Sequence, residues 1–246
     1  MFLAFALVLA LVVATSFVSG IFGVAGGLIL MGGLVYLLPV SQAMIVHGMA
    51  QFVSNGSRVF FWRTHVDLPI VAKFTAASVL CLLVFGLVRY VPPKTVVLFL
   101  LGFSTVLLFF VPQRWAPSIT QRGVPYLTGI AGTGLMLMAG VSGPFLDQFF
   151  VRSGLDRRVT IATKAAMQCV SHILKIVYFG ALAGSGLDEE WWALAALAPV
   201  AAVLGSSLAT PVLARMTDKQ FYWWTRRIVL VLGCYYIVEA VRSWMG

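Results

Sequence analysis

Apolar residues run along this chain in stretches of helical length, separated by short polar turns rather than by polar segments of domain size. The pattern predicts ten helical spans, at about 1–20, 27–39, 42–62, 67–90, 93–111, 123–142, 144–154, 157–181, 189–214 and 218–244. A straight helix needs about 20 residues to cross a hydrocarbon core of about 30 Å. The spans at 27–39 and 144–154 are too short for that, and each directly follows a glycine cluster.

The two glycine clusters belong to an internal repeat. GVAGG at 23–27 and GVSGP at 140–144 lie 117 residues apart. The same offset aligns, without a gap, AQFVSN (50–55) with MQCVSH (167–172) and Arg58 with Lys175. We therefore predict a duplication, with residues 1–115 and 116–246 as two repeats of one transmembrane domain. Because each repeat has five spans, an odd number, the two repeats should be inverted in the membrane, with half-helices that start near its midplane.

Composition agrees with a membrane protein. Hydrophobic residues make up 61% of the 246 residues and charged residues only 10%, whereas a soluble domain keeps about a quarter of its residues charged. The expected fold class is therefore all-α and polytopic. A net charge of +9 would suggest nucleic-acid binding in a soluble chain, but here the basic residues are scattered between apolar spans, and we expect no nucleic-acid partner.

The basic residues also predict an orientation. If all ten spans change sides, one face carries Arg63, Arg114, Arg122, Arg152, Arg157, Arg158, Arg215 and Lys219. The other face carries Arg89, Lys94 and Arg242, together with Asp188, Glu189 and Glu190. The positive-inside rule places the first face in the cytoplasm and both termini in the periplasm. The first apolar stretch lacks the basic region of a signal peptide, so we expect it to be a retained helix.

The interrupted segments suggest an anion site. The first turn of a helix exposes unpaired backbone N–H groups that carry roughly half a positive charge. Pro144 suits a first turn because it has no N–H to lose, and Gly26, Gly27 and Gly143 allow a ligand or another backbone to come close. Two such starts at one place should bind an anion. The alternative is that the glycines only let helices pack closely.

Two polar stripes point to the same place. One face of the span at 157–181 carries Lys164, Gln168, Ser171, His172 and Lys175, and the matching face of the span at 42–62 carries His47, Gln51, Ser54, Asn55 and Arg58. A polar stripe on an apolar helix faces the bundle or a cavity. These stripes are basic and rich in hydrogen-bond donors, which favours an oxyanion. Individually, the cations could instead reach the membrane surface, and the histidines and glutamines could bond between helices.

Asp147 has two interpretations. As the third residue after Pro144 it can stabilise the start of a helix, or it can carry a proton that is coupled to transport. We take Asp147, Lys164 and His47 as candidates for proton coupling. The three cysteines show no CxxC or Cys/His spacing, and we expect neither a metal site nor a cofactor.

The glycine motif, its repetition and the stretch RSGLDRRVTIATKAAMQ at 152–168 make this chain resemble the TauE/SafE sulfite exporter family of bacterial inner-membrane permeases. The resemblance covers about residues 10 to 245. It implies transport of small sulfur oxyanions, such as sulfite, or of organosulfonates, most often outward. The family's triple glycine is reduced here to GVAGG and GVSGP.

The sequence thus predicts a secondary exporter of sulfite or an organosulfonate in the bacterial inner membrane. Gly26, Gly27, Gly143 and Pro144 would hold the oxyanion, with hydrogen bonds and charge from the two stripes. An anion channel or an uptake permease for the same ligands is the main alternative. An intramembrane enzyme would need a nucleophile and base or a metal set, and only Asp147 with His172 could serve. A cation transporter would need several acids along its pathway, and only Asp147 qualifies.

Overall fold

The computed structural model describes residues 2–22, 24–112, 115–183, 189–213 and 215–245. Within these ranges it contains helices and no strands. The helices are α1 (Phe2–Phe22), α2 (Val24–Leu37), α3 (Val40–Phe61), η1 (Arg63–His65), α4 (Leu68–Val88), α5 (Lys94–Phe110), α6 (Val124–Ala139), α7 (Gly143–Phe150), α8 (Arg157–Val177), η3 (Tyr178–Leu182), α9 (Glu189–Leu213) and α10 (Asp218–Met245). Five of them are long and apolar enough to cross a membrane, and α2, α5 and α6 contain shorter apolar helices. The prediction of an all-α, polytopic membrane protein is confirmed.

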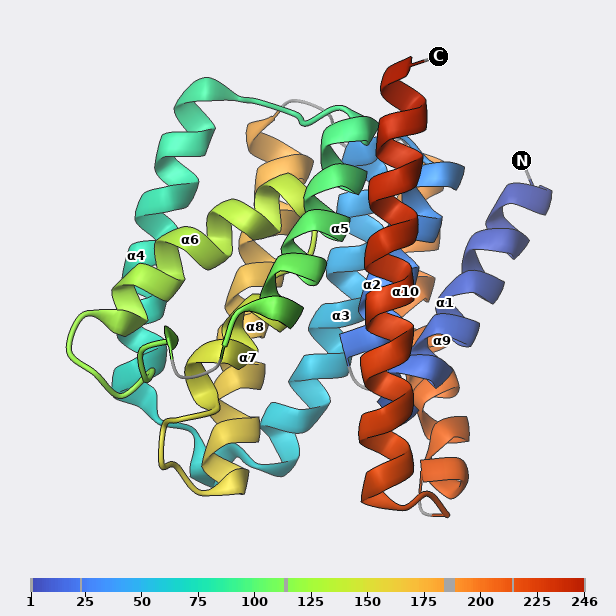
Figure 1. Cartoon of the computed structure of the whole chain (residues 1–246). Coiled ribbons are helices and arrows are strands. Elements are labelled where there is room, and N and C mark those ends of the chain that lie inside the picture. The colour runs from blue at the N-terminus through green and yellow to red at the C-terminus, as the bar shows by residue number, and fades with distance from the viewer. Residues whose placement is uncertain (1, 23, 113–114, 184–188, 214, 246) are drawn as a thin grey trace.

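The α-helices alternate in direction along the chain. α1 and α10 both have their free ends at the same end of the bundle, at the top of Figure 1. The α3–α4, α7–α8 and α9–α10 connections lie at the opposite end. Arg114 and Asp188 lie outside the described residues, as do the side chains of Glu189 and Glu190.

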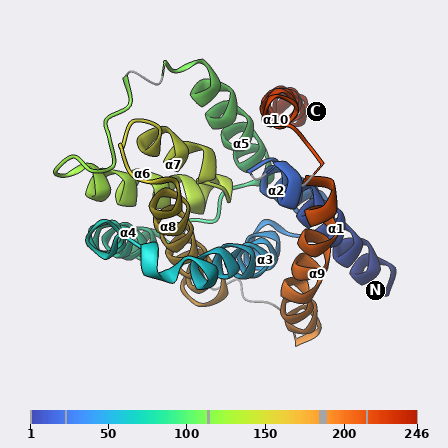
Figure 2. The ribbon, with the colours of Figure 1, turned by 90° about the horizontal axis from the view of Figure 1, so that it is seen from below.

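α3 and α8 pack against each other at the centre of the bundle, with α4 and α6 on one side and α1 and α9 on the other (Figure 2). The 117-residue offset relates α1 to α6 and α9 to α4, and the pair α1–α9 accordingly has a counterpart in the pair α4–α6. Figure 1 shows related helices running in opposite directions, α1 against α6 and α3 against α8. These pairings support the division at residues 115 and 116, which stays a prediction.

Both interruptions are present. α1 ends at Phe22 and α2 begins at Val24, and α2 folds back along α1 because Gly26 lies directly against Thr15 and Ser19. α6 ends at Ala139, where Gly140 takes φ +78° and donates its N–H to Met136 O. α7 then starts at Gly143, with Ser142 accepting from Leu146 N.

The two short helices differ from the spans that the sequence predicts. α2 begins at Val24 rather than at 27, since its glycines form the first turn instead of preceding it. α7 ends at Phe150 rather than at 154, because the chain turns there and Gly154 adopts φ +69°. Asp156 then caps α8 by accepting from Arg158 N.

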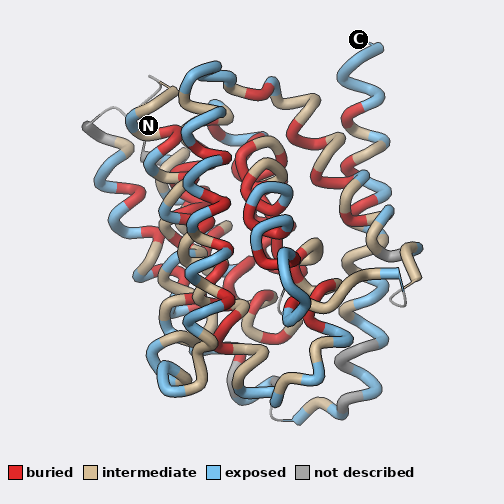
Figure 3. The backbone as a smooth tube through the Cα atoms, turned by 90° about the vertical axis from the view of Figure 1, so that its left-hand side faces the viewer, coloured by how far each residue is buried: buried red, intermediate tan, exposed pale blue. Residues whose placement is uncertain are grey.

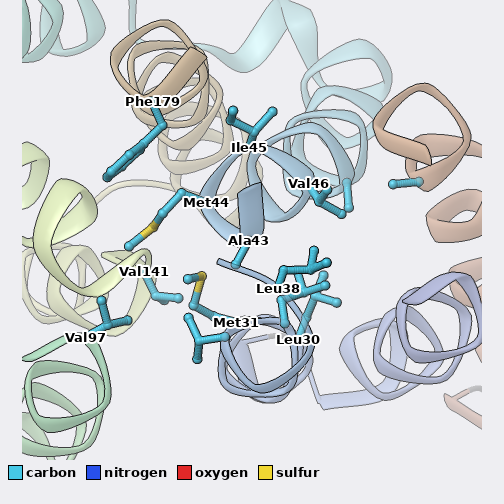
Figure 4. Packing of buried hydrophobic residues seen from close by; sticks show 14 of the residues in the cluster. Leu30, Met31, Leu38, Ala43, Met44, Ile45, Val46, Val97, Val141 and Phe179 are labelled. Atoms are coloured by element: carbon cyan, nitrogen blue, oxygen red, sulfur yellow. The ribbon is translucent and has the colours of Figure 1, made fainter. Parts of the chain in front are cut away.

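Buried residues line the interior of the bundle, and exposed residues cover its outward faces (Figure 3). The largest core cluster joins α2, α3, the α6–α7 connection and η3; it includes Met31, Met44, Val141 and Phe179 (Figure 4). The outward face of α4 exposes Leu80, Leu83 and Leu87. Exposed leucines in a row suit a surface that meets lipid.

Candidate functional site

A cavity of about 390 Å³ lies between α3, α8 and the two interrupted segments. Its lining includes nine residues that the sequence predicts for binding or coupling, namely Gly27, His47, Gln51, Asn55, Arg58, Gly143, Lys164, Gln168 and His172. The other lining residues are Ser19, Gly20, Ile21, Met136, Val141, Ser142, Ile161 and Ala165. The cavity therefore combines amides, imidazoles and cations with an apolar wall.

The interrupted segments meet at one end of this cavity. Gly27 lies in the first turn of α2, Gly143 begins α7, and both line the same space. Ser142, immediately before α7, is fully buried, and its Oγ has no hydrogen-bond partner. The Nδ1 atom of His172, which is also buried, is unpartnered too. Buried polar atoms are normally satisfied, and both residues line the cavity, so a rotation of either side chain would bring its polar atom toward a ligand there.

The central helices supply the side walls. Gln51, Asn55 and Arg58 follow one another along α3, and Lys164, Gln168 and His172 along α8. Asn55 donates to Gln51 O at 2.9 Å and accepts from Arg58 Nη1 at 3.0 Å, so it holds the guanidinium in place. From His47 and His172 the cavity extends toward Arg58 and Ile161, that is, toward the end of the bundle with the α3–α4 and α7–α8 connections (Figure 1).

An ion pair stands beside that end of the cavity. Lys164 on α8 contacts Asp147 on α7, and the two side chains keep 28% and 33% of their surface exposed. Asp147 is thus next to Lys164 and links two helices. Among the described residues, no group of three or more His, Cys, Asp or Glu side chains could hold a metal ion.

A second network lies at the other end. The Lys175 side chain is fully buried; its Nζ donates to Gly140 O at 2.9 Å and contacts His47 Nδ1 at 2.8 Å. The other ring nitrogen of His47, Nε2, lies 3.1 Å from Gly27 O. The network therefore joins the carbonyl groups of both glycine clusters.

The structure does not bring all predicted residues to the cavity lining. Gly26 packs on α1, and Ser171 donates to Met167 O. Pro144 lines a separate, narrow apolar space beside Leu101 and Leu108. Ser54, Asp147 and Lys175 also lie outside the lining. Sequence reasoning missed Ser142 and Ser19. Ser142 stands inside the GVSGP motif, so its position next to a helix start was a usable signal.

A bundle with two interrupted helices and a donor-lined cavity between them is the architecture of a multi-pass membrane transporter. The family model for the sulfite exporter TauE/SafE matches residues 7–236, nearly the whole chain, and the protein belongs to that family. The family is one of transporters that export sulfite and related sulfur compounds. No curated protein and no solved structure matches the chain.

Proposed function

We propose that the protein is a secondary transporter that exports sulfite or an organosulfonate across the bacterial inner membrane by alternating access. The observation that carries the proposal is the shared cavity, which the starts of α2 and α7 line together with Ser142 and His172. Helix starts present N–H groups and a partial positive charge, which favour an anion.

The donor set suits a sulfur oxyanion. Sulfite and sulfonate groups carry three oxygens at one centre, so several separate donors match them better than one planar fork. Gln51, Gln168 and His172 approach the cavity from facing helices, and Ser142 from the start of α7. Arg58 adds a positive charge toward the cavity's outer end, where Lys164 is already paired with Asp147.

The position of the cavity supports loading from the cytoplasm. It extends toward the end of the bundle that carries Arg63, Arg152, Arg157 and Arg158. By the positive-inside rule that end faces the cytoplasm, and the termini face the periplasm. A carrier that opens to the cytoplasm collects its substrate there, as an exporter must.

A buried apolar layer lies between the cavity and the end of the bundle that carries the termini, and it favours a carrier over an anion channel. Met44 lies one turn from His47 on α3, and Phe179 lies in η3, two turns past His172. Both are fully buried and pack in one cluster with Met31 and Val141 (Figure 4). This apolar layer separates the cavity from the end of the bundle that carries the termini.

Flux into proteoliposomes tests the proposal. Purified protein should carry labelled sulfite or a labelled sulfonate, and unlabelled anion inside the vesicles should accelerate entry, as exchange through a carrier does. Gln168→Ala should reduce this flux, whereas Gln121→Ala, in the exposed α5–α6 connection, should leave it unchanged. Absence of flux for every such anion would contradict the proposal, and flux without acceleration by internal anion would favour a channel.

A further inference from the structure

Lys175 is a buried cation in the last turn of α8. Its side chain has no exposed surface, and its Cε lies close to Gly48 of α3. The ammonium makes two polar contacts, with Gly140 O and His47 Nδ1. Neither of these two contacts is a carboxylate. Lys175 therefore has no carboxylate to balance its charge there, which is costly inside a membrane.

His47 connects this ammonium to the cavity. Its Nδ1 faces Lys175 and its Nε2 faces Gly27 O, so the ring can accept a proton on one side and release one on the other. His47 lines the cavity, and Lys175 does not. A proton can thus pass from Lys175 Nζ to His47 Nδ1, while the Nε2 proton leaves for water in the cavity; the pair then carries one charge fewer.

The internal repeat has no second copy of this lysine–histidine pair. At the 117-residue offset, Lys175 corresponds to Arg58 and His47 to Lys164. Arg58 keeps its charge at any accessible pH, and Lys164 has an acid partner. An arginine at position 175 would carry the same charge but would not lose its proton. A lysine beside an imidazole can lose its proton, so the charge of this pair can be removed.

The groups around the pair are few. The His172 ring on α8 lies 5.7 Å from the His47 ring, centroid to centroid. α2 and the segment 140–142 offer backbone carbonyls, Gly27 O and Gly140 O. Arg58, Lys164 and Asp147 stand further along the cavity. Within the described residues, none of the groups that contact the pair carries a negative charge, so an anion in the cavity would be the counter-ion for its proton.

We propose that Lys175 and His47 form a proton-binding pair and that the anion binds to the form of the protein in which this pair carries a proton. The inference rests on the proposed function and deepens it. An anion near His47 stabilises the charged pair, because opposite charges attract strongly in a medium of low dielectric constant. By reciprocity, the proton raises the affinity for the anion. Lys175 is then a positioning residue, which acts on the ligand through His47.

Binding of methanesulfonate to the purified full-length protein, measured by calorimetry at several pH values, tests the inference. Methanesulfonate is the anion of a strong acid and stays ionised, whereas sulfite itself titrates near neutral pH. The wild-type protein should take up protons from the buffer on binding. Above the pH at which the empty pair loses its proton, the dissociation constant should rise about tenfold per pH unit. Two buffers of different ionisation enthalpy give the number of protons.

Variants at position 175 test whether the proton that is taken up on binding depends on Lys175. Lys175→Arg keeps a charge that does not titrate, so it should bind the anion with little proton uptake and a flat pH profile. Lys175→Gln keeps a donor for Gly140 O without the charge; it should bind weakly at every pH, and neutral replacements of buried charges often fold well. The matched control is Lys94→Gln, since Lys94 stands over the Tyr36 ring, outside the cavity lining. It should retain the wild-type profile.

The outcomes separate the two proposals. Wild-type binding without proton uptake, or unchanged uptake in Lys175→Arg, overturns the proton-binding pair and leaves the proposed function standing. If the wild-type protein binds neither methanesulfonate nor sulfite, both proposals fail. The wild-type measurement needs no substitution, so the inference remains testable even if a variant does not fold.

Discussion

At the scale of single residues, Gly140 combines three requirements. Its φ of +78° belongs to the left-handed region, its carbonyl accepts from Lys175, and a Cβ atom there would come within 2.5 Å of Met31 Sδ. Gly154 has a similar φ of +69°, but nothing lies within 4 Å of the place where its Cβ would stand. A side chain at Gly154 would therefore meet backbone strain alone, whereas a side chain at Gly140 would meet both backbone strain and crowding.

Alanine at these two glycines should have different effects. Gly154→Ala should lower the free energy of unfolding by about 1 kcal/mol, the strain of an L-residue in the left-handed region. Gly140→Ala should lower it by roughly 2–4 kcal/mol, because overpacking against Met31 adds to that strain. Thermal unfolding in detergent measures both, and anion binding should be lost only in Gly140→Ala. Equal losses of stability would show that Met31 yields without strain.

Many residues of the candidate site could be predicted from the sequence. Their positions along the length of the cavity could not. The spacing of Gln51, Asn55 and Arg58 gives the face of a helix, and that face does line the cavity. The same spacing on α8 includes Lys175, which lies one turn past the cavity's end and is buried instead. A helical period determines the direction of a side chain but not where along the helix a cavity stops.

At the scale of elements, the start of α2 places two adjacent glycines in different surroundings. A Cβ on Gly26 would collide with the backbone of Thr15 and Ser19 on α1, whereas a Cβ on Gly27 would stand 3.4 Å from Gln51 Nε2, at the cavity wall. Gly26 thus permits the α1–α2 hairpin, and Gly27 keeps the binding space open. Two identical neighbouring residues in the sequence give no sign of this division of roles.

Substitutions at the two positions should separate stability from binding. Gly26→Ala should destabilise the protein by roughly 1–3 kcal/mol or more, because the atoms it meets are backbone and cannot rotate away. Gly27→Ala should leave the unfolding temperature unchanged or slightly higher, since alanine is the better helix former. It should nevertheless weaken anion binding, because its methyl group occupies the space beside Gln51. Thermal shift with and without methanesulfonate reads out both effects. Wild-type affinity in Gly27→Ala would exclude this part of the cavity from the site.

Helix order was predictable from the apolar pattern, but helix ends were less so. α7 stops at Phe150 because the chain turns through Gly154, which has a positive φ, before Asp156 caps α8. The π-helical turn at Tyr178–Leu182 leaves no mark in the sequence. It is stabilised by Tyr178 Oη, which donates to Tyr90 O at 2.8 Å, a contact between residues far apart in the chain.

At the scale of the whole molecule, the 117-residue offset predicted which helices are related, and the observed pairs α1–α9 and α4–α6 follow that relation. The sequence could not show that each first helix of a repeat packs on the fourth helix of the other. That arrangement leaves α3 and α8 together at the centre (Figure 2), which is why both polar stripes reach one cavity instead of two.

The orientation of the molecule is open to a direct test, because the cavity and the basic residues lie toward the same end of the bundle. A truncation fused after Gln121, in the α5–α6 connection, should make green fluorescent protein fluoresce and leave alkaline phosphatase inactive, since that end is predicted to be cytoplasmic. Fusions after Gly246 should show the reverse.

The two positions serve as each other's controls, because both reporters are scored at both sites. Fluorescence at both sites would mean an even number of crossings between them, so that one of the helices α6 to α10 would not cross the membrane. The opposite pattern at both sites would turn the molecule over, so that the cavity in this structure would load from the periplasm and the transporter would be an uptake system for the same anion.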